Sequence, residues 1–322
     1  MKRNKVASGP MANLILTDAK LCYLAEAAAL GSMHAAGEKL DVAVSSISRQ
    51  IAQLESQLGL PLIERGRRSI KLTQAGEMAV RYYRESITQR ETLVSSIQAL
   101  RGLRAGQVEL AVGEGFVNVL SALLQSFAAS HPGLRMSVKV AGTLEVMRQV
   151  RDDEAHIGLA FHSPPDPKLN VRATFAQPIR LIAHPRHPLS SKPSVTLSEV
   201  VQHRLCLPES SFRIGQMINL AGEHERVSLD AHMSTNSLHL LREMAKSGMY
   251  ATLLPEIAAA TELGRGELTA VPIDSAALQD TALTVICRLG RTLPSAPAAF
   301  LPVLEGGLRA WLKRPRMAGR EK

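Results

Sequence analysis

The side chains best suited to contact a polyanion lie on one polar stripe between residues 43 and 58. Four apolar residues in this segment recur at intervals of three and four, which places them on one side of a helix: Ile47, Ile51, Leu54 and Leu58. The opposite side carries small, polar or cationic residues and no carboxylate: Ser45, Arg49, Ala52, Gln53 and Ser56. Hydroxyl, amide and guanidinium groups read base edges and hold phosphates, although an ordinary solvated helix face has a similar composition.

Two shorter helices precede this segment and must position it. Asp18 is predicted to cap the first helix, which ends at Gly31, and Ser32 to cap the second, over residues 33–40. A three-residue turn then leads into the polar helix, which stops at Gly59. This is the plan of a helix-turn-helix, whose second helix lies in the major groove of DNA.

A cationic β-wing is predicted directly after this helix. A tight turn at Gly66 and the alternation of Ile70 and Leu72 favour two short strands. Four cations lie on or beside the turn: Arg65, Arg67, Arg68 and Lys71. Such a cluster suits the phosphate backbone, which supplies affinity without sequence choice.

Net charge is concentrated in the same part of the chain. The 322 residues carry a formal charge of +9, and residues 1–104 hold 15 Lys and Arg against 9 Asp and Glu. The remaining 218 residues therefore contribute only +3, so the front third is the part expected to bind a polyanion. Aromatic residues make up 3% of the sequence, which argues against a single-strand binder that stacks bases on rings.

Residues 21–77 resemble the winged helix-turn-helix of LysR-type transcriptional regulators. The shared pieces occur in order: GS at 31–32, SRQI at 48–51, LE at 54–55, LG at 58–59, PLIER at 61–65 and LTQAGE at 72–77. There are two departures. Ala36-Gly37 stands where the family usually has paired alanines, and Ala43-Val44-Ser45 where it usually has Ser-Gln-Pro. The second departure removes a cap and a glutamine that could read a base, so the family's target sequence cannot be carried over.

The helical phase and this resemblance together predict eight contacts to double-stranded DNA. They are Ser45, Arg49 and Gln53 in the major groove, Ser46 and Gln50 at its margins, and Arg65, Arg67 and Arg68 on the phosphates. The resemblance also implies RNA polymerase as a partner.

A long helix is predicted from residue 74 to about residue 104. Its apolar residues keep steps of three and four, with Arg90 in the remaining position: Val80, Tyr83, Ile87, Val94 and Ile97. The stripe is narrow and has polar flanks, so a partner helix is favoured over packing against its own domain. We therefore expect a homodimer or a dimer of dimers, as the resemblance also implies, with Gly102 and Gly106 marking a hinge.

From residue 107 onward, predicted strands alternate with helices. The strands are expected at 108–113, 136–142, 156–161, 179–184, 205–209, 227–233, 250–255 and 282–288. This alternation predicts an α/β architecture of two lobes that enclose a cleft, with chain crossings near 163–167 and 268–273. The segment resembles the effector domain of the same family, which has the fold of type 2 periplasmic-binding proteins.

The predicted fold class is thus an N-terminal all-α winged helix-turn-helix followed by an α/β effector domain. The expected parts are a disordered basic tail at 1–12, the DNA-binding domain at 13–73, the linker and dimerisation helix at 74–104, the effector-binding domain at 105–312 and a basic tail at 313–322. Within the effector domain, lobe I is expected at 105–163 and 273–312, and lobe II at 164–272.

Ten residues are predicted to line the cleft, because ligands of α/β lobes lie at the carboxyl ends of strands. They are Glu114, Gly115, Phe116, Thr143, Phe161 and His162 in the first lobe, and Ser210, Ser211, Asn236 and Ser237 in the second. Pockets of the family commonly present hydroxyls at the first of these positions. Glu114 is thus a departure, which either indicates an effector with a positive or hydrogen-bond-donating group or marks a solvent-facing carboxylate.

No catalytic, cofactor or metal motif is apparent. The Gly113-Glu114-Gly115 turn imitates the start of a dinucleotide fingerprint, but Asn118 stands at the third glycine. His184 and His187 lack a third placed ligand, even with Glu223 and Glu225 considered. GxSxG, P-loop and HExxH runs do not occur, so we expect neither an enzyme nor a cofactor.

The cysteines and the N-terminus indicate a cytoplasmic protein. The three cysteines, Cys22, Cys206 and Cys287, are odd in number and far apart, so no disulfide framework or CxxC metal site is apparent, although redox sensing by Cys206 stays open. The apolar run at 14–16 is too short for a signal peptide or a membrane span. Met11 is an alternative start.

We interpret the sequence as a sequence-specific DNA-binding transcriptional regulator whose activity depends on a small-molecule effector. An alternative is a solute-binding protein of periplasmic-binding-protein type without DNA function, which requires an export signal. A third interpretation, an α/β enzyme, requires a catalytic constellation.

Overall fold

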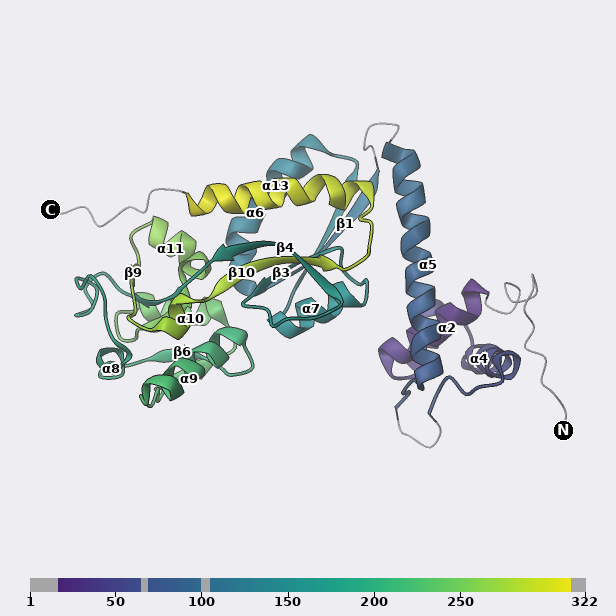
Figure 1. The fold of residues 1–322 in the computed structure, drawn as a ribbon, viewed down its shortest axis with the longest axis horizontal. Helices are drawn as coiled ribbons and strands as arrows, with labels where there is room; N and C mark the ends of the chain where they lie inside the picture. The colour runs from purple at the N-terminus through teal and green to yellow at the C-terminus, as the bar shows by residue number, and fades with distance from the viewer. Residues whose placement is uncertain (1–16, 65–68, 100–104, 314–322) are drawn as a thin grey trace. The chain divides into compact units, whose positions relative to one another are not determined.

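The computed structural model describes residues 17–64, 69–99 and 105–313. The chain forms two compact units that divide between Glu91 and Thr92, within the long helix α5 (Gln74–Ala99; Figure 1). In the described residues, no helix is long and apolar enough to cross a membrane.

The first unit packs three short helices against the start of α5. They are α2 (Asp18–Leu30), α3 (Met33–Leu40) and α4 (Val44–Leu58). The core is built from the apolar stripe of each helix: Leu21, Leu24, Ala25, Ala27, Ala36, Ile47, Ile51, Leu54, Leu62 and Val80. Three of the four apolar residues predicted on α4 are in this core, whereas Leu58 at the helix end is 38% exposed.

The helix caps differ in part from those predicted. Ser32 caps α3 as expected, because its hydroxyl accepts the main-chain N–H of Ala35 at 3.3 Å. The prediction that Asp18 caps α2 is wrong. Thr17 is the N-cap, and Asp18 lies in the first turn, where its carboxylate pairs with Arg90 of α5.

The base of the predicted wing is a short antiparallel pairing. Ile63 and Leu72 form a bridge, and the N–H of Glu64 donates to the carbonyl of Lys71 at 2.9 Å. Residues 65–68, with the predicted turn at Gly66, lie outside the described residues.

The apolar stripe of α5 is buried only along its first half. Val80 is 5% exposed, whereas Val94 and Ile97 are 52% and 54% exposed, and Leu93 beside the stripe is 61% exposed. Gly102 of the predicted hinge lies outside the described residues, and Gly106 is the first residue of a strand and not part of a linker.

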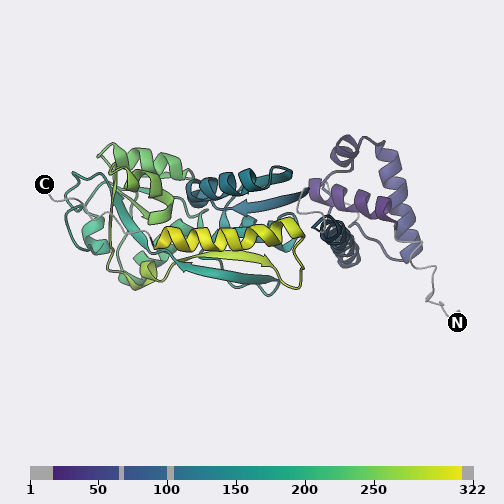
Figure 2. The ribbon, with the colours of Figure 1, turned by 90° about the horizontal axis from the view of Figure 1, so that it is seen from above.

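Lobe I, as the structure shows it, is a five-stranded sheet with helices on both faces. The strand order is β2 (Leu134–Val140), β1 (Gly106–Val112), β3 (Ile157–Phe161), β10 (Ala282–Arg288) and β4 (Leu169–Ala176). β1 is parallel to β2 and β3, whereas β10 is antiparallel to its two neighbours. Helices α6 (Val117–Ser130) and α13 (Ser295–Leu312) lie together on one face, and α7 (Thr143–Arg151) covers the other (Figures 1 and 2).

Lobe II is built on two smaller sheets. One has the order β8 (Thr252–Pro255), β5 (Ile179–Ala183) and β9 (Thr269–Val271); the other pairs β6 (Cys206–Pro208) with β7 (Met233–Thr235). A parallel bridge between Leu205 and Ala251 joins them. The helical elements are α8 (Leu197–Val200), α9 (Arg213–Glu225), α10 (Leu238–Lys246), η2 (Glu256–Ala259), α11 (Ala260–Gly264) and α12 (Ala276–Gln279).

Both predicted crossings between the lobes are wrong. Residues 169–176 form β4, which pairs with β10 in lobe I, so the chain leaves lobe I only at Gln177. Likewise β9, at the predicted second crossing, pairs with β5 in lobe II, and the chain returns near Thr281. The predicted strand at 227–233 is also wrong, because β7 begins at Met233. β4 and β9 were missed because they are edge strands with largely polar or half-exposed residues, which leaves little periodicity to detect.

The two crossings lie side by side and bond to each other. The N–H of Gln177 donates to the carbonyl of Thr281 at 2.8 Å, and the Thr281 hydroxyl donates to the carbonyl of Gln177 at 2.7 Å. Both residues are buried, so the connection between the lobes is narrow and ordered. One hydrophobic cluster spans both lobes and includes Phe116 and Phe161 from lobe I and Leu238 from lobe II.

Candidate nucleic-acid interface and interlobe cleft

Helix α4 presents the predicted polar face to solvent. Ser45, Arg49 and Gln53 are exposed, as are Ala52 and Ser56. Ser46 and Gln50 are half-buried at the edges of this face, while Ile47, Ile51 and Leu54 hold the other side in the core. Within the described residues no hydrogen bond engages the Arg49 side chain, so its guanidinium donors are available to a partner.

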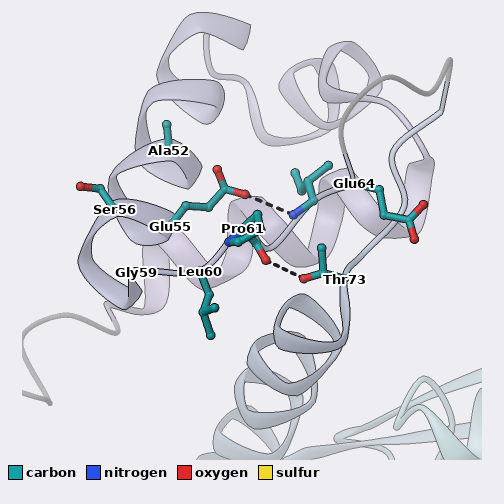
Figure 3. A pocket seen from close by; sticks show the side chains of 9 residues that line it. Ala52, Glu55, Ser56, Gly59, Leu60, Pro61, Glu64 and Thr73 are labelled. Atoms are coloured by element: carbon teal, nitrogen blue, oxygen red, sulfur yellow. Dashed lines mark hydrogen bonds between the residues drawn. The ribbon is translucent and has the colours of Figure 1, made fainter. Parts of the chain in front are cut away.

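A carboxylate fixes the chain that follows α4. Glu55 lies on α4, and its Oε1 accepts the main-chain N–H of Leu62 at 2.7 Å and of Ile63 at 3.2 Å. Figure 3 shows the second of these bonds. These N–H groups belong to the start of the wing base. Glu55 therefore joins α4 to the wing base through two charge-assisted hydrogen bonds.

Thr73 and Gly76 complete this junction from the start of α5. The Thr73 hydroxyl donates to the carbonyl of Pro61 at 2.6 Å (Figure 3) and accepts the N–H of Gly76 at 3.1 Å. A Cβ at Gly76 would lie 2.1 Å from the carbonyl oxygen of Leu62, so only glycine allows this approach. The LE, PLIER and LTQAGE pieces of the sequence therefore meet at one junction.

A surface groove of about 550 Å³ runs along this junction (Figure 3). It is lined by Ala52, Glu55, Ser56, Gly59, Leu60, Pro61, Ile63, Glu64 and Thr73. Two carboxylates and an exposed leucine make it a poor place for a phosphate. The carboxylate-free part of α4, from Ser45 to Gln53, is the better surface for DNA.

The predicted phosphate contacts Arg65, Arg67 and Arg68 lie outside the described residues. Lys71, on the second side of the wing base, is exposed. The role of these cations stays a prediction.

In the second unit, five of the ten predicted cleft residues line one cavity between the lobes. They are Glu114, Gly115, Phe116, Thr143 and Phe161. The rest of the lining is Gly113, Ala141, Gly142, Phe212, Arg213, Ile214, Leu238 and Pro255. The cavity measures only about 30 Å³, which is the volume of about one water molecule in the liquid. Sites for small-molecule ligands are roughly ten or more times larger, so the cleft is closed in this structure.

Glu114 crosses from lobe I to lobe II. Its Oε2 accepts the N–H of Leu238 at 3.3 Å, and its Oε1 accepts the N–H of His239 at 3.2 Å. These are the first two N–H groups of α10, where a negative charge is favoured by the helix dipole. The expectation that Glu114 indicates a cationic effector, or simply faces solvent, therefore loses its basis.

Arg213 makes a second contact between the lobes, and the sequence prediction missed it. Its Nε donates to the carbonyl of His162 at 3.0 Å, while its Nη1 donates to Gln216 at 3.1 Å. Burial and then the Arg213 charge lower the pKa of His162. Arg213 lies at the start of α9, a few residues after the predicted cleft residues Ser210 and Ser211, and this position is the feature of the sequence that indicates it.

The remaining predicted cleft residues lie away from the cavity lining or are used locally. Ser210, Ser211 and Asn236 are exposed, and Ser237 is the N-cap of α10, where its hydroxyl accepts the N–H of Leu240. Thr143 lines the cavity, but its hydroxyl donates to the carbonyl of Phe161 at 3.1 Å.

In the described part of the chain, no group of three or more His, Cys, Asp and Glu side chains is placed to hold a metal ion. His184 and His187 instead accept main-chain N–H groups through Nδ1, from Arg186 and Leu189 respectively. Burial raises the pKa of the Cys206 thiol, which disfavours the reactive thiolate.

Two family models match the chain. Residues 19–77 match the bacterial regulatory helix-turn-helix protein of the lysR family, and residues 101–309 match the LysR substrate binding domain. The second match alone spans more than half of the chain.

Named relatives are similar over most of their length. The HTH-type transcriptional activator CmpR of Synechocystis is 24% identical over 252 residues, which cover 77% of this chain and 82% of CmpR. The HTH-type transcriptional regulator CbbR of Rhodospirillum rubrum is 26% identical over 281 residues, which cover 86% of this chain and 92% of CbbR.

Solved structures share the fold. One is full-length OxyR from Pseudomonas aeruginosa, in a cysteine-to-aspartate variant, which superposes with a TM-score of 0.69 at 19% sequence identity. The match covers 95% of this chain and 99% of the OxyR chain. Full-length CbnR in complex with its target DNA superposes with a TM-score of 0.56 at 21% sequence identity. The match covers 90% of this chain and 99% of the CbnR chain.

Proposed function

The chain belongs to the LysR family of transcriptional regulators, and from that premise we propose which surfaces perform its two tasks. The outward face of α4 reads a specific double-stranded DNA sequence, and a small-molecule effector binds between lobes I and II. The observation that carries the first task is the exposed, carboxylate-free face of Ser45, Arg49 and Gln53, which lies opposite the buried Ile47, Ile51 and Leu54.

Within this proposal the eight DNA contacts divide by role. Ser45, Arg49 and Gln53 contact base edges, and Ser46 and Gln50 contact the groove margins. Arg65, Arg67 and Arg68 contact phosphates, which adds affinity for every sequence.

The exposed half of the α5 stripe supports a self-associating protein. Val94 and Ile97 of the stripe, and Leu93 beside it, are more than half exposed, which is costly for a helix without a partner. We infer that residues 74–104 pair with the same helix of a second copy, to give a homodimer or homotetramer. RNA polymerase contact, action in the cytoplasm and the lack of an enzymatic activity belong to the same proposal.

The proposed parts of the chain are a DNA-binding domain at 13–73, the dimerisation helix at 74–104 and the effector-binding domain at 105–312, between tails at 1–12 and 313–322. No cofactor is required for either task. The alternative of a solute-binding protein does not account for the helix-turn-helix match at 19–77.

Two arginine variants test the DNA-binding proposal. Arg49→Ala should weaken binding to the chain's own operator by about 1 to 3 kcal/mol, and relax the preference over scrambled DNA. Arg67→Ala should weaken binding to both DNAs alike and flatten the salt dependence. Gel-shift titration against the upstream region of the protein's own gene measures both effects.

A matched control is Arg135→Ala, which removes one exposed arginine from β2 of the second unit. Its affinity should equal that of the unmodified protein. Unchanged affinity in both Arg49→Ala and Arg67→Ala would exclude the proposed surface.

A further inference from the structure

The contact of Glu114 with α10 joins two parts of the chain that are far apart in sequence. Glu114 lies on the short helix η1 (Glu114–Phe116), directly after β1 of lobe I, and 124 residues separate it from Leu238. Its two oxygens take the first two N–H groups of α10, and Ser237 takes the N–H of Leu240. The first three N–H groups of α10 are thus satisfied, and two of their three acceptors are supplied from the opposite lobe.

The surrounding surfaces of the two lobes are in close contact. A Cβ at Gly115 would lie 3.1 Å from the Cβ of Ala258 and 3.4 Å from a Leu238 methyl group. Arg213 of lobe II bonds the carbonyl of His162 in lobe I nearby. Together these contacts leave a cavity of about 30 Å³, in which a metabolite does not fit.

We propose that Glu114 is an internal latch that holds the cleft closed, and that an effector enters by displacing its carboxylate from the amino end of α10. This rests on the proposed function, because it takes the cleft between the lobes as the effector site. The narrow connection at Gln177 and Thr281 allows the lobes to separate, since only two chain segments cross there.

The latch determines what kind of group an effector must bring. When Glu114 leaves, the N–H groups of Leu238, which is buried, and of His239, which is exposed, lose a charged acceptor at the positive end of α10. This loss is unfavourable for the N–H of Leu238 unless it is satisfied again. A ligand group that replaces Glu114 must accept hydrogen bonds and suits the positive end of the helix dipole. The effector is therefore expected to carry a carboxylate or a similar anionic group, the reverse of the expectation from sequence.

The latch can be tested with acetate, which can occupy the position that the Glu114 carboxylate leaves empty in Glu114→Ala. In the full chain, Glu114→Ala should lower the melting temperature of the second unit by roughly 4 °C in sodium chloride, because two hydrogen bonds to a charged group are lost. Sodium acetate at equal ionic strength should restore part of that loss in a saturable way, because acetate supplies the missing carboxylate. The unmodified chain should not respond.

Glu223→Ala is the matched control, since Glu223 is an exposed carboxylate on α9 of the same unit. It should show neither the loss nor the acetate response. The latch is excluded if acetate stabilises Glu114→Ala no more than the unmodified chain.

Glu114→Gln supplies a second measurement that does not depend on the fold of the alanine variant. It keeps the shape of the side chain and removes its charge, so the amides of Leu238 and His239 should exchange with solvent on the order of ten times faster. Unchanged exchange at both amides would contradict the proposal. Neither measurement involves DNA, so loss of the latch is distinguishable from loss of DNA binding, which Arg49→Ala reports.

Discussion

Two glutamates, one in each unit, perform the same chemistry with different consequences. Glu55 accepts the N–H groups of Leu62 and Ile63, and Glu114 accepts those of Leu238 and His239. The first contact spans seven residues and fixes a loop to the helix beside it. The second spans 124 residues and joins two lobes that are otherwise connected by two crossings. A carboxylate bound to main-chain N–H groups thus fixes neighbouring segments in the first unit, whereas in the second it forms the proposed contact that can open between two lobes.

The two candidate binding surfaces differ accordingly. The α4 face is exposed, and its Arg49 donors are not used by the described residues. In the cleft, Glu114, Thr143 and Arg213 are all engaged with groups of the protein itself. A rigid groove of DNA requires a surface formed in advance, whereas a small ligand must be enclosed, so its site has to open first.

Gly76→Ala should have the largest effect, and it tests whether the first unit is the more rigidly packed of the two. A Cβ there would overlap the Leu62 carbonyl, so the first unit should lose about 3 kcal/mol of unfolding free energy while the second unfolds as before. Thermal unfolding, followed separately in the two units, measures this difference.

Gly306→Ala provides the control, because its added Cβ meets nothing within 4 Å on α13. It should be neutral or slightly stabilising. An equal effect of both substitutions would show that the junction at Gly76 yields easily.

Acid should weaken the second unit through His156. Burial and then the charge of Arg291 lower the pKa of His156 to about 3, and its Nδ1 accepts the N–H of Glu109 at 3.0 Å. The unfolded chain takes up this proton near pH 6.5 and the folded chain does not, so stability is complete above pH 6.5 and falls steadily down to pH 3. At pH 5 the loss from this group should be about 2 kcal/mol.

His156→Asn keeps a hydrogen-bond acceptor and removes the proton-binding site. Its free energy of unfolding, measured by urea titration between pH 5 and 8, should change less with pH than that of the unmodified chain. Identical slopes would show that His156 does not contribute to the acid sensitivity.

Glu55→Gln sharpens the comparison of the two glutamates. It should cost the first unit about 2 kcal/mol, because the charged acceptor of two N–H groups is lost. DNA affinity should fall for all sequences alike, since the wing base moves and the α4 face does not. Glu38→Gln, an exposed carboxylate on α3, serves as the control in denaturant titration and gel shift. A loss of sequence preference in Glu55→Gln, without loss of affinity, would contradict the expectation that Glu55 holds the wing base and leaves the α4 face unchanged.

Loss of a helix N-cap should have the smallest effect on stability, and this effect should be the same in both units. Ser32 caps α3 and Thr196 caps α8, each through its hydroxyl. Ser32→Ala and Thr196→Ala should each cost about 1 kcal/mol, and aspartate at either position should restore most of it. Calorimetry that found a cost in one unit only would show that capping depends on the surrounding unit.

Much of the local structure followed from periodicity and caps. The bounds of α3 and β10 agree with their predictions, and α4 (Val44–Leu58) lies within the predicted segment at 43–58. These elements have strong signals because each one buries a complete face. β4 and β9 were missed because an edge strand buries little, and so both lobe crossings were placed wrongly.

The sequence by itself determined the family, the helix-turn-helix and the polar face of α4, because all three depend on short motifs and helical periodicity among residues that are close together in the chain. Only the tertiary structure showed that Glu114 caps α10, that Arg213 reaches His162 and that the cleft is closed. Those contacts join residues 51 to 125 positions apart, and their partners are main-chain groups, which carry no side-chain signal in the sequence.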